Sequence, residues 1–97
     1  MIGSTGVHKR IRLTVTGTVQ GIGFRFFALK AAKRHDICGW VRNLPDTAVE
    51  IECEGTQETI DAFIAELRTG HPWAKVTDVI MEWQDHKNEF RNFEIRY

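Results

Sequence analysis

Residues 15–25 read VTGTVQGIGFR, a stretch in which a β-branched run passes through a glycine-rich loop into the start of a helical pattern. Glycines let successive peptide N–H groups turn toward a common centre. The N-terminus of the following helix adds unpaired donors and the positive end of its dipole. Arg25 offers a permanently charged planar fork that suits two phosphate oxygens. The stretch therefore predicts a small oxyanion site, for phosphate.

Spacing excludes two better-known phosphate loops. A Walker loop requires Gly-Lys-Ser/Thr after its four spacer residues, whereas residues 22–24 read Ile-Gly-Phe. A dinucleotide fingerprint that began at Gly21 would need a third glycine at Phe26 and a second βαβ unit. For the Gly-x-Gly pattern alone, one alternative stays open: a tight strand-to-helix turn with Arg25 solvated on the helix.

A longer pattern bears on this choice. Residues 15–25, together with GWVRN at 39–43, closely resemble the two signature stretches of the acylphosphatase family. The resemblance covers nearly the whole chain and continues through Pro72, Ala74, Val76, Trp83 and the final residues 93–97. In one departure, residues 44–48 read LPDTA where the family usually places Asp-Gly or a similar flexible turn. The resemblance implies hydrolysis of the carboxyl-phosphate bond of small acyl phosphates, without a cofactor.

Length and charge set limits on the class of protein. The chain has 97 residues, and we expect a flexible leader at 1–8 and a single domain at 9–97. Lys plus Arg (13) balances Asp plus Glu (13), although residues 8–42 hold most of the positive charge. Proteins that bind nucleic acid or membrane surfaces usually carry an excess of positive charge, which this chain does not have. No apolar run is long enough for a membrane-spanning helix, and the N-terminus lacks the apolar core of a signal peptide. We expect a cytoplasmic protein without nucleic-acid or membrane partners.

The two cysteines are expected to remain free thiols. If the strands around Cys38 and Cys53 bury their apolar sets in the same core, the two side chains point to opposite faces. A disulfide between them would then require a bulge or a register slip. Free thiols suit a reducing compartment, and neither cysteine has a metal-ligand or redox spacing.

Hydrophobic periodicity predicts five strands and two helices. The strands are expected at 10–16, 37–43, 49–54, 76–83 and 93–97, and the helices run from Phe24 to His35-Asp36 and from Thr56 to Gly70. The offset of Val76 from the alternation of Val79, Met81 and Trp83 indicates a bulge or an irregular start.

Two sets of side chains are assigned by their period. In the first helix the inward stripe is expected to be Phe24, Phe27, Ala28 and Ala31, widened by Phe26 and Leu29. In the third strand, Glu50, Glu52 and Glu54 alternate with an apolar set. We expect these carboxylates to be solvated on the outward face rather than to form an acid/base or metal site.

The element order predicts an α+β, ferredoxin-like split βαβ fold. A β-α-β-β-α-β plan with one further C-terminal strand gives a mostly antiparallel sheet with two helices on one face. In this plan the third and fourth strands flank the first, and the loop after the first strand lies near the strand end that carries Asn43. The pairing of the last strand is left open by the sequence.

Asn43 is the second candidate site residue. It shares the inward parity of Val41, yet an amide in a core requires hydrogen-bond partners. At the strand end beside the loop, its amide can hold a water against the anion that Arg25 binds. On composition, a turn-forming asparagine before Leu44-Pro45 is an equal competitor. The resemblance of residues 39–43 to the family motif favours the functional interpretation.

The absence of several kinds of catalytic group from the sequence is compatible with acyl phosphate chemistry. The sequence has no evident Ser/His/Asp or Cys/His constellation and no metal-ligand spacing. An ordinary phosphate ester would be hard to cleave without a general acid or a metal, because its alkoxide leaving group needs one of them. An acyl phosphate instead releases a carboxylate, which is stable without protonation. Positioning and charge stabilisation can therefore carry most of the rate. The resemblance implies that Asn43 orients the attacking water, without a metal. It also implies that the Arg25 guanidinium and a backbone loop bind the phosphoryl group, the loop comprising Gln20, Gly21, Ile22, Gly23, Phe24 and Arg25.

Three other functions compete with acyl phosphate hydrolysis. The main alternative is a non-catalytic module that binds acyl or carbamoyl phosphate. A ferredoxin-like RNA-binding domain is disfavoured by the acidic outward face of residues 49–54, and a structural adaptor by the glycine-rich loop beside an arginine. We expect a monomer, because no large apolar stripe is left unassigned.

Overall fold

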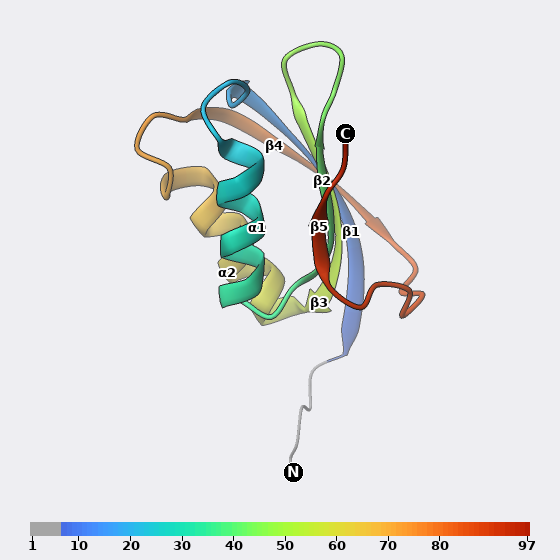
Figure 1. Ribbon diagram of the computed structural model, residues 1–97. Coiled ribbons are helices and arrows are strands. Elements are labelled where there is room, and N and C mark those ends of the chain that lie inside the picture. The colour runs from blue at the N-terminus through green and yellow to red at the C-terminus, as the bar shows by residue number, and fades with distance from the viewer. Residues whose placement is uncertain (1–6) are drawn as a thin grey trace.

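The computed structural model describes residues 7–97, and its elements follow the expected order (Figure 1). The five strands are β1 (His8–Thr18), β2 (Cys38–Asn43), β3 (Val49–Thr56), β4 (Lys75–Gln84) and β5 (Phe93–Ile95). The helices are α1 (Phe24–Arg34) and α2 (Gln57–Thr69). β1 begins at His8, so the last residue of the expected leader is part of the sheet, whereas residues 1–6 lie outside the described residues. Within residues 7–97, neither helix is long and apolar enough to cross a membrane.

The sheet confirms the ferredoxin-like α+β plan. Its strand order is β4-β1-β3-β2-β5, so β1 lies between β3 and β4 and pairs antiparallel with both. β2 and β3 form the expected antiparallel hairpin. The sequence left the partner of the last strand open; in the structure, β5 pairs parallel to β2 at the edge of the sheet. Both helices lie on the same side of the sheet (Figure 1).

The core lies between the two helices and the inner face of the sheet. β1 contributes Ile11, Leu13 and Val15, which are fully buried, and α2 contributes its stripe of Ile60, Phe63, Ile64 and Leu67. α2 begins at the expected N-cap, because Thr56 accepts from the Thr59 N–H in a capping box. The irregularity expected at the start of β4 is confirmed as a register shift opposite Thr16/Gly17.

One position of the predicted α1 stripe is wrong. Phe24, Ala28 and Ala31 are buried and Leu29 packs against the core, but Phe26 is 55% exposed. Two residues along a helix correspond to about 200° of rotation, which places Phe26 on the opposite side from Phe24. Phe26 therefore does not widen the buried face.

The expected solvation of the three β3 carboxylates is also wrong. Glu52 is 4% exposed and Glu54 is 5% exposed, and Glu50 is buried as well. The side chains do lie on the outer face of the sheet, but basic side chains and the segment before β5 cover them. Arg10 and Arg12 hydrogen-bond Glu52, Arg42 pairs with Glu50, and the N–H groups of residues 87–89 donate to Glu54.

Candidate active site

The loop between β1 and α1 owes its shape to two glycines. Gly21 and Gly23 have φ angles of 78° and 77°, in the left-handed region that side chains with a Cβ rarely adopt. Gly23 is also the N-cap of α1, and it supplies no side-chain cap. The N–H groups of the first helical turn are therefore left available for an anion.

The side chain of Gln20 ties this loop to the β2–β3 hairpin. Its Nε2 donates to the backbone oxygens of Leu44 and Ala48 at 2.9 and 2.8 Å. The hairpin turn is itself closed by the Leu44 N–H, which donates to the Ala48 oxygen at 2.9 Å. Asp46 accepts from the Ala48 N–H at 2.9 Å. The LPDTA turn thus replaces the flexible turn of the family pattern with a closed one, and it holds the end of β2 against the loop.

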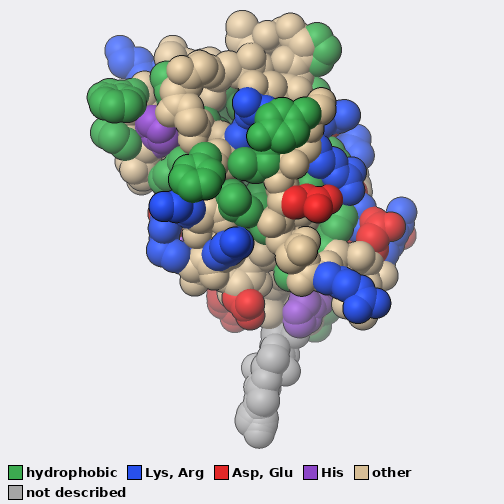
Figure 2. All heavy atoms as spheres, viewed as in Figure 1, with side chains coloured by type: hydrophobic (Ala, Val, Ile, Leu, Met, Phe, Trp, Pro, Cys, Tyr) green, Lys and Arg blue, Asp and Glu red, His purple; other side chains and the backbone are tan. Residues whose placement is uncertain are grey.

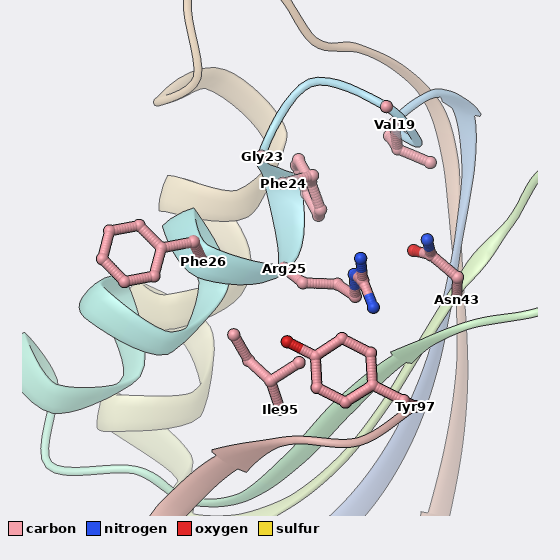
Figure 3. Close-up of a pocket in the computed structure, with 9 residues that line it drawn as sticks. Val19, Gly23, Phe24, Arg25, Phe26, Asn43, Ile95 and Tyr97 are labelled. Carbon is pink, nitrogen blue, oxygen red and sulfur yellow. The ribbon is translucent and has the colours of Figure 1, made fainter.

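Arg25 and Asn43 face each other across a cavity at this end of the sheet (Figure 3). Arg25 lies in the first turn of α1, and its guanidinium extends toward the Asn43 amide at the end of β2. The parallel pairing of β5 with β2 brings Tyr97 to the same place. The centre of its ring lies 4.9 Å from Arg25 Cζ, within the range of a cation–π interaction.

The cavity has a volume of about 220 Å³. Its lining comes from the loop, α1, β2 and the C-terminal segment, and comprises Val19, Gly21, Gly23, Phe24, Arg25, Phe26, Asn43, Ile95 and Tyr97. Of the residues predicted for the backbone loop, Gly21, Gly23, Phe24 and Arg25 line the cavity, whereas Gln20 and Ile22 do not. The ring of Phe26 points away from Arg25 and Asn43 (Figure 3).

Arg25 is the cationic side chain that lines the cavity, and it has no carboxylate partner among the described residues. Arg10, Arg12 and Arg42 all lie in the basic stretch 8–42, but each forms an ion pair with a β3 glutamate. Among residues 7–97, Arg25 has no ion pair. Figure 2 shows Lys and Arg side chains interspersed with hydrophobic ones on this face. An anion that enters the cavity therefore meets an un-neutralised guanidinium.

The chain is similar to known proteins of one family. The family model described as acylphosphatase matches residues 11–95. This chain belongs to the acylphosphatase family. It is 43% identical to an acylphosphatase of Bacillus licheniformis, over 89% of this chain and 96% of that protein. Its identity to an acylphosphatase of Salinibacter ruber is 39%, over 95% of this chain and 97% of the relative.

A solved structure supports the same assignment. The crystal structure of acylphosphatase from Bacillus subtilis superposes with a TM-score of 0.87 at 35% identity, covering 92% of this chain and 99% of that one. The chain is accordingly an enzyme that hydrolyses acyl phosphates to a carboxylate and inorganic phosphate. This outcome favours the enzyme over the binding module that the sequence left as its main alternative.

The sequence did not assign Val19, Phe26, Ile95 and Tyr97 to the site. Tyr97 and Ile95 belong to the alternating C-terminal segment, whose strand partner was open, so their position beside Arg25 could not be inferred. The pairing of β5 with β2 was the missing information. Both cysteines are free, as expected, and burial raises the pKa of the Cys53 thiol. Within the part of the chain that the structure describes, no group of three His, Cys, Asp or Glu side chains is arranged to hold a metal ion.

Proposed function

We propose that this acylphosphatase works by positioning and charge stabilisation alone, with no metal. The loop N–H groups of residues 20–25 and the Arg25 guanidinium bind the phosphoryl oxygens. Asn43 orients a water for in-line attack on phosphorus. The P–O bond to the acyl group breaks, and its electron pair leaves with the carboxylate. The proton of the attacking water passes to a substrate oxygen.

The observation that carries this proposal is the placement of Arg25 opposite Asn43 in one cavity (Figure 3). A guanidinium without an ion pair offers two parallel N–H donors to a dianionic phosphoryl group. Gly21 and Gly23, both in the left-handed region, lead the loop into the start of α1, where no side chain caps the free N–H groups. Because the leaving group is a carboxylate, the reaction requires no general acid to protonate it.

The test is hydrolysis of acetyl phosphate in the presence of excess chelator, by the wild type and by Arg25→Ala. We expect wild-type turnover to survive the chelator and Arg25→Ala to lose at least about 10²-fold in rate, the typical cost of removing such a donor. Arg68→Ala is the matched control, because Arg68 is exposed in the last turn of α2, away from the cavity. Near-full activity of a folded Arg25→Ala protein, or loss of wild-type activity with chelator, would contradict the mechanism.

We also propose that the enzyme is a cytoplasmic monomer. A single copy of the chain already brings Arg25, Asn43 and the glycine-rich loop together around one cavity. The free thiols of Cys38 and Cys53 suit a reducing compartment. Light scattering of the purified protein measures the oligomeric state directly, and a dimer mass would contradict the first part of this proposal.

A further inference from the structure

His71 lies in the loop between α2 and β4 and contacts the glycine-rich loop between β1 and α1. Its Nε2 is 2.9 Å from the carbonyl oxygen of Ile22. Its Nδ1 accepts a hydrogen bond from the Trp73 N–H at 3.1 Å. A carbonyl oxygen only accepts, so Nε2 carries the proton, and Nδ1 must be unprotonated to accept from Trp73. The two backbone groups thus select the tautomer with hydrogen on Nε2.

Aromatic contacts fix the orientation of this imidazole. The ring of Phe27 meets it edge-on at a centroid distance of 5.4 Å, and the ring of Phe24 lies at 6.2 Å. Both phenylalanines belong to the first turn of α1, the turn that carries Arg25. The ring of Trp73, in the same loop as His71, lies at a centroid distance of 6.1 Å. The imidazole is therefore held between its own loop and the start of α1.

The hydrogen bond to Ile22 determines the direction of the next N–H group. The described part of the chain has no cis peptide bond, so the Ile22 C=O and the Gly23 N–H point in opposite directions from one peptide plane. Gly23 lines the cavity, and His71 does not. Holding the Ile22 carbonyl on His71 turns the Gly23 N–H away from His71.

We infer that His71 is a positioning residue that keeps the Gly23 N–H directed at the phosphoryl group. This inference rests on the proposed role of the loop N–H groups in binding phosphate. His71 has no part in proton transfer, because both ring nitrogens are engaged by backbone groups and neither faces the cavity. Its effect should therefore appear in phosphate binding.

Three substitutions separate the donor, the acceptor and the ring. His71→Gln keeps an N–H donor near the position of Nε2, His71→Asn keeps an acceptor near Nδ1, and His71→Phe keeps only the aromatic packing. The matched control is His35→Phe, because the His35 ring hydrogen-bonds Glu66 at 2.8 Å and does not line the cavity. For each folded variant we would measure kcat and KM for acetyl phosphate and the competitive inhibition constant of inorganic phosphate.

We expect His71→Phe and His71→Asn to raise KM and the phosphate inhibition constant about three- to tenfold, which corresponds to one lost hydrogen bond. His71→Gln should stay within about twofold of the wild type for the same reason. His35→Phe should lower thermal stability without changing phosphate inhibition. In ¹⁵N spectra, the Gly23 amide should shift on phosphate addition in the wild type and His71→Gln, and shift less in His71→Phe.

Two kinetic results would overturn this inference alone: phosphate inhibition unchanged in His71→Phe, or His71→Gln as impaired as His71→Phe. An imidazole spectrum with the proton on Nδ1 would also overturn it. A wild-type enzyme that phosphate does not inhibit would instead overturn the loop as the phosphate site, and this inference with it.

Discussion

At the scale of single residues, Arg25 and Asn43 have different chemical roles in one cavity. Arg25 carries a permanent charge and stacks on Tyr97, with a ring-to-Cζ distance of 4.9 Å. Asn43 is neutral and half-buried at the end of β2. A cation attracts the ground-state phosphoryl group and the transition state alike, whereas a water-orienting amide acts mainly on the attack. The two residues can therefore be separated kinetically.

For Asn43→Ala we expect kcat to fall by about 10²–10³-fold, because the attacking water loses its orientation. The inhibition constant of inorganic phosphate should change by less than about threefold, since the charged contact is retained. Steady-state kinetics with phosphate as a competitive inhibitor measures both quantities.

Asn92→Ala is the control for this substitution, because Asn92 is exposed before β5 and does not line the cavity. An Asn43→Ala enzyme with normal kcat would show that the amide only shapes the turn.

At the scale of elements, β1 and β3 are joined by a buried ionic network as well as by their backbone ladder. Arg10 is 5% exposed, and its Nε donates to Glu52 at 2.7 Å. Arg12 donates to the other oxygen of Glu52 at 2.7 Å. Burial alone would raise the pKa of Glu52, but the hydrogen bonds from Arg12 and Arg10 outweigh it and hold the pKa below its usual value.

Glu52→Gln should therefore lower the free energy of unfolding by roughly 3 kcal/mol, because one partner of a buried ion pair is removed. Glu94→Gln is the matched control: Glu94 is 56% exposed in its side chain and pairs with Arg96 at 3.5 Å, so its loss should cost less than about 1 kcal/mol. Urea denaturation at neutral pH measures both values. Equal effects of the two substitutions would contradict a buried network.

At the scale of the whole molecule, three carboxylates make stability depend on pH. For Glu54, burial alone would raise the pKa, but N–H donors from Lys87 and Glu89 outweigh it and lower the pKa. Hydrogen bonds from Arg34 and His35 lower the pKa of Glu66, which links α1 to α2. The pKa of Glu52 is likewise lowered, because its hydrogen bonds to Arg12 and Arg10 outweigh the effect of burial.

These shifts have one sign, so their effects add. A carboxyl group with a depressed folded-state pKa stabilises the protein above its unfolded-state pKa, which is about 4.3 for glutamate. That contribution is lost as the pH falls through the folded-state values. We expect the free energy of unfolding to be nearly constant from about pH 7 to 5 and to fall steeply below it. Urea titrations across this range measure the curve, and Glu52→Gln should flatten it. Stability that rises on acidification would contradict the assignment.

The features that the amino-acid pattern predicted correctly are those that depend on neighbours along the chain. The glycine-rich loop, the arginine in the first turn of α1 and the Thr56 cap are local, because turn geometry and helix caps involve residues a few positions apart. The alternating apolar sets also predicted the hairpin and the ferredoxin-like order. These local signals placed Arg25 and Asn43 at one end of the sheet.

What covers each face of the sheet, and which distant residues meet, could be read only from the folded chain. The two-residue alternation in β3 predicts that Glu52 points outward. It does not predict that Arg10 covers this carboxylate. The C-terminal alternation could not place Tyr97 over Arg25, because the pairing of β5 with β2 is a long-range contact. The contact of His71 with Ile22 joins residues 49 positions apart. Such contacts depend on packing between elements, which no local pattern encodes.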